Sequence, residues 1–398
     1  MASALAFAVL LADTIRRVYA VGRELNDHFV TAVVTGCMGF YLLICQIGPP
    51  EAMALGAGGM VGIWGLFFSL HRNQAPPAMV RLALGLPSQL AYAFALWGGL
   101  LVVLRLPYAL STGAHWFWPG AWLAIPLALT LAGFTHTHAT RYRVRTHTVE
   151  GLPLRLVQLS DLHASPMMHR AELDPLVSRV NALAPDLVVV TGDLVMPFSE
   201  EEHGYLVEAL ANIEAPVYAC PGNHDLPVLE QLRAELAKVG ATLLVDESAK
   251  VSNGEVELVG LNFHWKKARN AMEQSLANLG ERGKAFRVLL AHDPRLGAWL
   301  EGGFDLALSG HTHGGQVGLN MFGIPFSFLR LFGVRDQGWF SIPGGRHYVH
   351  SGNWLTGLPP RLGVGPEIAL FCPDLKPAPR AARGESPPAR PDPDRPAR

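Results

Sequence analysis

Acidic, imidazole and amide side chains recur directly after five short apolar runs in the second part of the sequence. The runs are 154–159, 187–191, 217–220, 288–291 and 306–309. The side chains that follow them are Asp161, His163, Asp193, Asn223, His224, Asp225, His292, His311 and His313. Carboxylate, imidazole and amide groups together suit divalent ions such as Mn²⁺, Fe²⁺ or Zn²⁺. The pattern therefore predicts a centre for divalent metal ions.

A pair of ions would suit the chemistry of phosphate esters. Ions about 3.5 to 4 Å apart can orient the phosphoryl oxygens and neutralise the charge that develops during in-line displacement. A carboxylate must bridge such a pair, and we expect Asp193 to be that bridge. The predicted cofactors are therefore two divalent metal ions, with manganese, iron or zinc favoured.

The elements that must position these side chains have an α/β rhythm. The apolar runs resemble buried strands in length and composition, as does the run 256–261. The segments 172–183 and 227–239 between them have the periodicity of amphipathic helices. In open α/β sheets, ligands bind just outside the carboxyl ends of the strands. We therefore expect the motifs to meet at the strand ends of one α/β domain.

Five ordered motifs over some 150 residues carry a family resemblance. They are Asp161-x-His163, Gly192-Asp193, Gly222-Asn223-His224-Asp225, His292 and Gly310-His311-x-His313. The set resembles the calcineurin-like metallophosphoesterase superfamily. The late segments 358–361 and 366–368, with the extended motif 310–316, resemble its membrane-associated bacterial branch more narrowly.

The resemblance implies a four-layer α/β (α+β) sandwich and a metal-dependent phosphoric ester hydrolase. Its reaction would be hydrolysis of a phosphoester or pyrophosphate by a metal-bound hydroxide. One metal would lie on Asp161, His163, Asp193 and His313. The other would lie on Asp193, Asn223, His292 and His311. His224 would contact the substrate phosphate or protonate the leaving oxygen as the catalytic residue.

One position departs from the family pattern. Family members usually carry a carboxylate three residues after the bridging Asp, where it orients the catalytic His, and this chain has Met196 there. A nearby residue such as Asp225 is a candidate substitute, because catalytic and metal-binding histidines usually need a second partner.

The first 140 residues hold nearly all the long uncharged stretches, so residues 1–140 are expected to form a membrane domain. A membrane helix needs roughly 20 mostly apolar residues. Four spans are predicted, at 29–47, 53–70, 89–104 and 116–134. Arginines precede the first span, lie between the second and third, and follow the fourth, which places both chain ends in the cytoplasm. We therefore expect a multi-pass integral protein, of the bacterial cell membrane by the resemblance, with membrane lipids as partners.

The composition agrees with this division. The 398 residues are 49% apolar and only 16% charged, with a formal net charge of −1. No global positive field would attract nucleic acid, so no nucleic-acid partner is expected. Cys37, Cys45, Cys220 and Cys372 have no C-x-x-C spacing and indicate no disulfide framework. The catalytic domain is expected at 148–374, followed by a disordered tail rich in Pro, Arg and Ala at 376–398.

Several features near the motifs have two interpretations. The apolar run 321–332 is either core packing or a lip that dips into a membrane and admits a lipid tail. Arg330, Arg335 and Arg361 either hold an anionic headgroup or are solvated. His264 and Trp265 either line the substrate pocket or pack within a loop.

The predicted substrate is a phosphorylated small molecule, with a lipid or a lipid-linked nucleotide as one candidate. Two alternatives remain. One is a phosphodiesterase that is tethered to the membrane and acts on soluble nucleotides. The near-neutral net charge disfavours long nucleic acid as its substrate. The other is a catalytically inactive metal-binding membrane sensor, which only Met196 favours.

Overall fold

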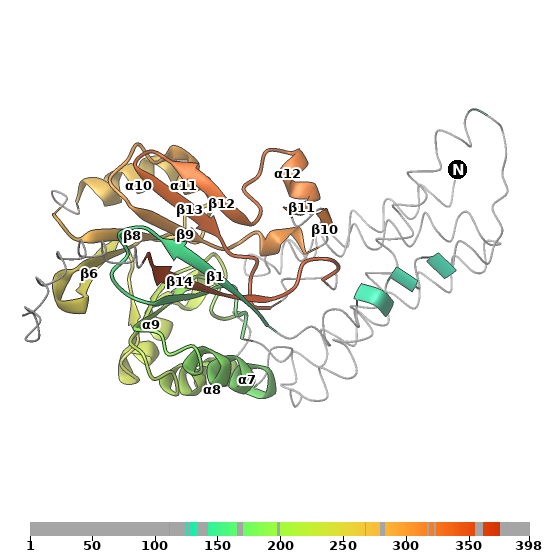
Figure 1. The fold of residues 1–398 in the computed structure, drawn as a ribbon. Coiled ribbons are helices and arrows are strands. Elements are labelled where there is room, and N and C mark those ends of the chain that lie inside the picture. Colours follow the sequence, from blue (N-terminus) through green and yellow to red (C-terminus); the bar gives the residue numbers. More distant parts are fainter. Residues whose placement is uncertain are drawn as a thin grey trace, which may run out of the picture.

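The computed structural model describes residues 142–164, 170–196, 200–266, 268–278, 283–316, 318–321, 324–354 and 361–374, with a few residues between 111 and 133. Within 142–374 the chain forms two six-stranded sheets, and helices cover the outer side of each (Figure 1). This is a four-layer arrangement of helices, sheet, sheet and helices.

The first sheet has the strand order β1-β14-β2-β3-β4-β5. Strands β2 to β5 are parallel, β14 is antiparallel to β2, and β1 is parallel to β14. The bounds are β1 Arg143–Val149, β2 Leu156–Leu159, β3 Leu187–Thr191, β4 Val217–Cys220, β5 Thr242–Leu243 and β14 Glu367–Pro373.

The second sheet has the order β12-β13-β9-β8-β7-β6. Its central strands β13, β9, β8 and β7 are parallel, and the edge strands β12 and β6 are antiparallel to their neighbours. The bounds are β6 Glu247–Val251, β7 Val256–Gly260, β8 Phe286–Leu290, β9 Leu306–Ser309, β12 Gly338–Ile342 and β13 Gly345–Val349. A separate hairpin joins β10 Gly318–Met321 to β11 Ile324–Ser327.

Each helix packs through one apolar stripe. In α7 (Arg170–Asn181), Leu173, Leu176 and Val180 recur at helical spacing and are buried against the first sheet. Helices α8 (Glu200–Ala211) and α9 (Leu229–Lys238) join them on the same side. Helices α10 (Ala268–Ala277) and α11 (Arg295–Trp299) cover the outer side of the second sheet. The short helix α12 (Phe328–Leu331) follows the hairpin.

The strands alternate between two cores. In β3, Val188 and Val190 pack with the helices, whereas Leu187 and Val189 pack between the two sheets. This period of two is what an extended strand imposes on its side chains. Because both faces of the strand are covered, β3 reads as an unbroken apolar run, as the sequence predicted.

The predicted α/β part is confirmed: each of the six apolar runs overlaps a strand, and both predicted helical segments overlap a helix. The predicted multi-span membrane anchor needs correction. No helix in the described part of the chain is long and apolar enough to cross a membrane. Its longest helices, α7 and α8, have 12 residues each and would reach about 18 Å, against about 30 Å of hydrocarbon.

The prediction of a multi-span anchor was therefore wrong for the described part of the chain. The prediction of a multi-pass integral membrane protein depended on that anchor and is corrected with it. Of the four predicted spans, 29–47, 53–70 and 89–104 lie outside the described residues, and only short helical pieces of 116–134 are described. The predicted tail at 376–398 also lies outside the described residues.

Candidate metal centre

Loops that follow five strands bring the predicted side chains together at one edge of the two sheets. Asp161 and His163 follow β2, Asp193 follows β3, Asn223 and His224 follow β4, His292 follows β8, and His311 and His313 follow β9. The backbone N–H of His311 donates to Oδ1 of Asp161 at 3.0 Å. This bond ties a loop of the second sheet to a loop of the first.

One cluster consists of Asp161, His163 and His313. Nε2 of His313 lies 3.2 Å from Oδ1 of Asp161 and 3.1 Å from Nε2 of His163. The two imidazole rings stack with their centroids 5.0 Å apart. All three side chains are almost fully buried. Three donor atoms therefore converge on one small region that water scarcely reaches.

A second cluster consists of Asp193, His292 and His311. Nε2 of His292 lies 3.1 Å from Oδ2 of Asp193 and 3.2 Å from Nδ1 of His311. His292 is fully buried as a side chain, and Asp193 nearly so. The arrangement again presents one carboxylate oxygen and two imidazole nitrogens to a common point.

Asp193 connects the two clusters. Its Oδ2 atom lies 3.1 Å from Nε2 of His292 and 3.6 Å from Nε2 of His163. Its other oxygen, Oδ1, accepts the backbone N–H of His224 at 2.9 Å, which fixes the carboxylate in place. The geometry is that of a carboxylate between two groups of donors.

The donor set fits divalent metal ions. Oδ1 of Asn223 is buried and has no hydrogen-bond partner among the described residues. An unpartnered buried carbonyl oxygen is costly unless something else satisfies it, and a cation would do so. Carboxylate, imidazole and amide donors are the types that borderline and hard divalent ions prefer. The residues present therefore fit a divalent metal site.

Backbone carbonyls orient two of the histidines. Nδ1 of His292 lies 2.7 Å from the carbonyl oxygen of Thr191, and Nδ1 of His313 lies 3.0 Å from that of Trp354. A carbonyl oxygen can only accept, so in each ring Nδ1 carries the proton and donates. Nε2 of each ring is then left to face the clusters. Such outer partners commonly fix the ring orientation of metal-binding histidines.

The clusters favour ionised carboxylates. Burial alone would raise the pKa of Asp193, but the neighbouring His292 and His224 outweigh it and hold that pKa well below its ordinary range. Burial would likewise raise the pKa of Asp161, which His313 holds below its ordinary range. Both carboxylates are therefore charged at neutral pH, as metal ligands must be.

The imidazole groups of the predicted ligands differ in their pKa. Burial alone would lower the pKa of His292, but the Asp193 carboxylate raises it to about 10. Burial and the adjacent His292 lower the pKa of His311 to about 4. Burial lowers the pKa of His163 as well. At neutral pH, His163 and His311 thus present free lone pairs, whereas His292 carries a proton that a metal would displace.

The backbone at the site is strained. Five of the predicted ligands have left-handed φ angles: Asp161 at 55°, His163 at 46°, Asp193 at 53°, His311 at 71° and His313 at 49°. Such angles are uncommon for residues other than glycine and cost of order 1 to 3 kcal/mol each. They persist where the surroundings over-determine them, which is typical of functional sites.

Two glycines of the motifs are required by close approach. A Cβ atom at Gly222 would collide with the side chain and backbone of Asp193. A Cβ atom at Gly310 would collide with Ser160 and the carboxylate of Asp161. The glycine that precedes Asn223, and the one that precedes His311, therefore let neighbouring loops approach the donor side chains.

The Asp225 carboxylate has contacts with backbone amides, and its proposed role as partner of His224 stays a prediction. Its carboxylate accepts the backbone N–H groups of Leu194 at 2.9 Å, Val195 at 3.1 Å and Gly222 at 2.8 Å. Burial and the nearby Asp193 raise its pKa to about 7. Asp225 therefore joins the loops after β3 and β4, and its oxygens are directed at backbone amides.

At Met196, the position that departs from the family pattern, the backbone N–H donates to the carbonyl of Ala164 at 3.0 Å.

A sixth loop, residues 350–354, follows β13 and was not predicted from the sequence as part of the site. Oδ1 of Asn353 accepts the N–H of Ser160 at 2.8 Å, and the N–H of Trp354 donates to the carbonyl of Asp161 at 3.1 Å. The loop thus supports the first metal-binding motif from behind. The signal was present, because polar Ser351 and Asn353 follow the apolar end of β13 just as the other motifs follow their strands.

Arg361 is buried beneath the loop 350–354, with only 1% of its surface exposed. Its guanidinium donates to the carbonyl oxygens of Ser351 at 2.7 Å and Trp354 at 2.5 Å. The Trp354 carbonyl also accepts from His313, so the arginine and a predicted ligand share one oxygen. Burial lowers the pKa of Arg361 to about 10, which leaves it charged at neutral pH.

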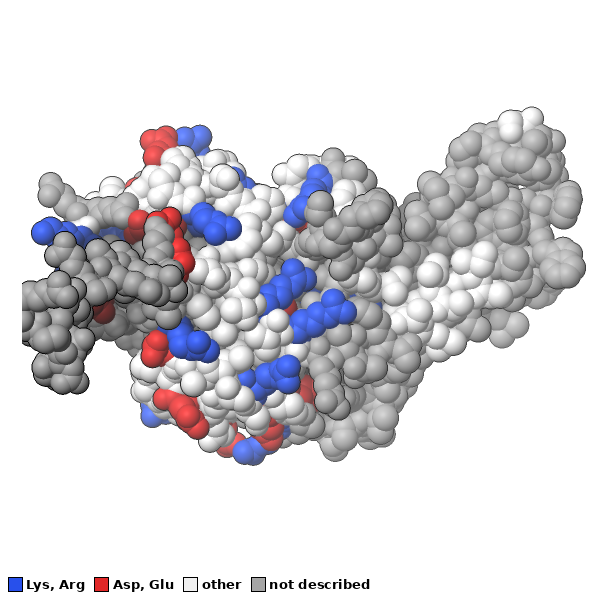
Figure 2. Space-filling view, viewed as in Figure 1, with Lys and Arg blue, Asp and Glu red and all other residues white. Residues whose placement is uncertain are grey.

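The other arginines considered for an anionic headgroup are engaged with protein groups. Arg330 forms an ion pair with buried Asp336 at 2.7 Å. Nη1 of Arg335 lies 2.9 Å from Nδ1 of His347. These contacts support structural roles for both side chains. Figure 2 shows basic and acidic side chains interspersed over the visible face of the domain.

Comparisons with known proteins agree with the site. Residues 154–315 match the family model described as calcineurin-like phosphoesterase. The chain carries a calcineurin-like metallophosphoesterase domain. The matched range begins two residues before β2 and ends two residues after His313, so it spans all five predicted motifs.

Relatives of this metallophosphoesterase occur in several bacteria. An uncharacterized metallophosphoesterase of Aquifex aeolicus is 29% identical over an alignment of 259 residues that covers 61% of this chain and 96% of the relative. Phosphodiesterase YaeI of Escherichia coli is 29% identical over 262 residues, covering 61% and 93%. The uncharacterized metallophosphoesterase YkuE of Bacillus subtilis is 28% identical over 249 residues, covering 60% and 84%.

These findings establish a metal-dependent phosphoesterase. The family and the clusters of histidine and aspartate agree on a divalent metal site. They do not place the chain in a membrane-associated branch of the metallophosphoesterases.

Proposed function

We propose that this metallophosphoesterase hydrolyses phosphodiesters of small molecules at a centre of two divalent metal ions. One ion is held by Asp161, His163, Asp193 and His313, and the other by Asp193, Asn223, His292 and His311. Manganese, iron and zinc are the expected elements, from the mixture of oxygen and nitrogen donors.

The position of Asp193 carries the proposal. Its Oδ2 atom faces one histidine of each cluster, at 3.1 Å and 3.6 Å. A single ion would leave one cluster of buried donors without a cation, whereas a shared carboxylate serves two ions at once. When bound, the ions supply Lewis-acid polarisation of the phosphoryl oxygens and a nucleophile at neutral pH.

His224 is the proposed catalytic residue. Its ring lies edge-on to that of His163, with centroids 4.9 Å apart, so it borders the first cluster. Its backbone N–H bond to Asp193 fixes the residue beside the bridge. From this position the imidazole can bind the phosphate or pass a proton to the leaving oxygen.

The choice of a diester rests on a relative. The Escherichia coli protein YaeI is named a phosphodiesterase, and this chain covers 93% of its length. The lipid-linked substrate stays a prediction, because most side chains of the run 321–332 lie outside the described ones. An inactive metal-binding sensor is disfavoured, because the loops after β2, β3, β4, β8 and β9 all carry residues of the predicted ligand types, which supports an intact centre.

The test is hydrolysis of bis-p-nitrophenyl phosphate and of p-nitrophenyl phosphate by the full chain. The protein is stripped of metal and then titrated with Mn²⁺, Fe²⁺, Zn²⁺ or Mg²⁺. We expect turnover to return with two ions per chain and to favour the diester. Binding of two ions without turnover of either ester would favour the sensor, and saturation at one ion would refute the dinuclear centre.

A further inference from the structure

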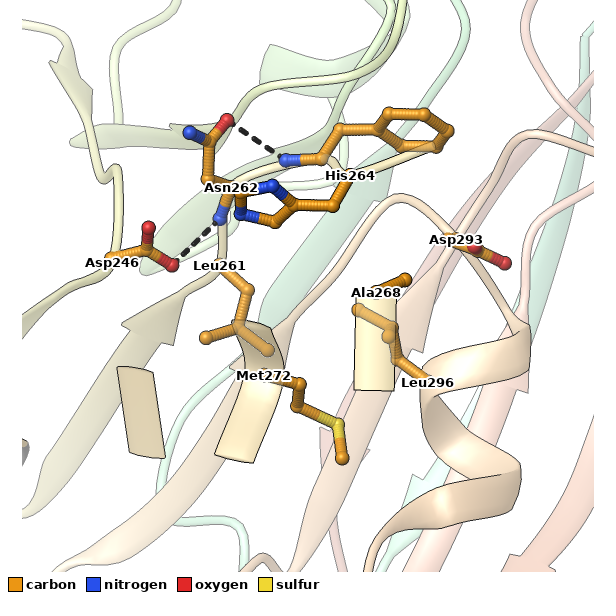
Figure 3. A pocket seen from close by; sticks show the side chains of 9 residues that line it. Asp246, Leu261, Asn262, His264, Ala268, Met272, Asp293 and Leu296 are labelled. Carbon is orange, nitrogen blue, oxygen red and sulfur yellow. Dashed lines mark hydrogen bonds between the residues drawn. The ribbon is translucent and has the colours of Figure 1, made fainter. Parts of the chain in front are cut away.

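The loop after β7, residues 261–266, lies beside the metal centre and is held firmly. The N–H of Leu261 donates to the carbonyl of Leu290 at 3.0 Å. The N–H of Asn262 donates to Oδ1 of Asp246 at 3.1 Å, and Oδ1 of Asn262 accepts the N–H of Phe263 at 2.8 Å (Figure 3). These bonds hold the backbone of the loop from Leu261 to Phe263.

Phe263 joins this loop to the predicted metal ligands. Only 3% of its surface is exposed. Its ring centroid lies 5.8 Å from that of His292 and 5.5 Å from that of His311, both within the range of direct ring contact. Phe263 thus packs against two predicted ligands of the second cluster.

Trp265 continues the aromatic surface outward. Its indole packs edge-to-face on Phe263 at 4.9 Å and lies 6.4 Å from the ring of His311. In contrast to Phe263, Trp265 remains 49% exposed. A large aromatic side chain that keeps half its surface in water beside a reaction centre is suited to contact a ligand.

The cavity next to this loop is too small to hold a substrate group. It has a volume of about 10 Å³, roughly one water molecule, and is lined by residues that include His264, Met272 and Asp293 (Figure 3). A substituent larger than a water molecule does not fit this cavity, and the outer surface of the loop is the alternative place for it. Among the described residues 261–266, Trp265 is the large apolar side chain that is exposed there.

We propose that Trp265 is a stacking platform for a planar aromatic substituent of the phosphodiester, of the nucleobase type. The inference rests on the proposed function, because the phosphate must lie at the metal centre for the substituent to reach the indole. Phe263 is the positioning residue, because its ring packs between the indole of Trp265 and the ring of His311. An aromatic ring on an indole gains stacking without a specific hydrogen bond, so the site selects for planarity rather than for one base.

Two substrates with the same leaving group test this inference. Thymidine 5′-p-nitrophenyl phosphate and ethyl p-nitrophenyl phosphate release the same phenol and differ in the retained substituent. In the full metal-loaded chain, Trp265→Ala should lower kcat/KM for the thymidine ester by about 5- to 150-fold, mainly through KM. The ethyl ester should change less than about twofold, and Trp265→Phe should keep most of the preference.

The matched control is Phe332→Ala. Phe332 is 82% exposed and is the other strongly exposed large apolar side chain in the described part of 142–374. Its removal should leave the ratio between the two esters unchanged. Equal losses on both esters in Trp265→Ala, or no loss on either, would overturn the platform. An octyl ester that loses as much as the thymidine ester would show an apolar contact without selection for planarity, and would also overturn it.

Binding separates this inference from the proposed function. Calorimetric affinity of the metal-loaded protein for thymidine 5′-phosphate should fall by a similar factor in Trp265→Ala, while affinity for inorganic phosphate should stay the same. Absence of turnover by the wild-type chain would count against the proposed function and leave this comparison intact. Equal affinity of wild type and variant for the nucleotide would refute the platform even in an active enzyme.

Discussion

Oδ2 of Asp193 lies 3.1 Å from Nε2 of His292, and both side chains are withdrawn from solvent. Without a metal the two groups form a buried ion pair, since the pKa of His292 is raised to about 10 and that of Asp193 is held low. A cation would take the place of the imidazole proton. The pair therefore couples metal uptake to proton release.

Metal binding should release one proton from His292 at neutral pH. Because its pKa is about 10, apparent affinity for the second ion should rise about tenfold per pH unit between pH 6 and 9. His311, with a pKa lowered to about 4, should contribute no proton there. Calorimetry in buffers of different ionisation enthalpy measures the release. The release should vanish in His292→Asn and persist in His311→Asn.

Replacing the shared carboxylate should disable both ions. In Asp193→Asn the amide is neutral and presents only one oxygen to the two clusters. We expect metal affinity and kcat to fall by more than the roughly 10- to 100-fold seen when outer partners of metal ligands are removed. Metal content by elemental analysis and diester hydrolysis measure the effect. Glu301→Gln, the same change at a side chain that is 90% exposed, should alter neither.

The fold was predictable to the extent that its signals were local. Unbroken apolar runs marked β3 and β9 because both faces of each strand are buried. Strand β1 pairs with β14, more than 200 residues later in the chain. The polar sequence of β1 alternates exposed and partly buried positions, so its strand character depends on a partner that local reasoning cannot supply.

The site was predictable where it repeated one pattern, a polar motif after an apolar run. The sequence could not show that Asp225 turns to backbone amides, because that choice depends on how the loops after β3 and β4 meet. It could not show that Arg361 is buried, since a Pro-rich neighbourhood favours a solvated arginine. Phe263 escaped notice because an isolated Phe after a strand is most often core packing.

Loss of the Arg361 guanidinium should weaken the fold and the first cluster together. Arg361→Met leaves the carbonyls of Ser351 and Trp354 without this donor in a buried site, which should cost roughly 3 to 5 kcal/mol of unfolding free energy. Because Trp354 orients His313, affinity for one ion should also fall about 10- to 100-fold. Urea denaturation and metal titration measure the two effects. Arg143→Met, at an exposed position of β1, should be near neutral.

Stability should decline in acid partly through His347. Nδ1 of His347 faces the Arg335 guanidinium, which can only donate, so the ring is neutral and its Nε2–H donates to Oγ of Ser309. Burial and Arg335 lower its pKa to about 3. The unfolded chain takes up the proton near pH 6.5, so the contribution is complete above that pH and is lost as pH falls toward 3.

The expected loss from His347 is on the order of a few kcal/mol. Urea denaturation at intervals from pH 7 to pH 4 measures it. His147, whose pKa burial lowers to about 4, adds to the same slope, so only the difference between wild type and His347→Asn is assigned to His347. The variant should be less stable at pH 7 and less sensitive to acid. Parallel curves for the two proteins would contradict the assignment.

His224 should act on the leaving group and not on metal uptake. Its backbone N–H bonds the bridging carboxylate, and the predicted metal ligands do not include its ring, so His224→Asn should preserve the bond to Asp193 and the metal content. If the imidazole protonates the leaving oxygen, kcat should fall about 10²- to 10⁴-fold for an ester with a poor alcohol leaving group. The fall should be much smaller for p-nitrophenol, which leaves readily as an anion. A uniform loss across leaving groups would instead assign His224 to phosphate binding, because stabilisation of the phosphoryl oxygens serves every ester alike.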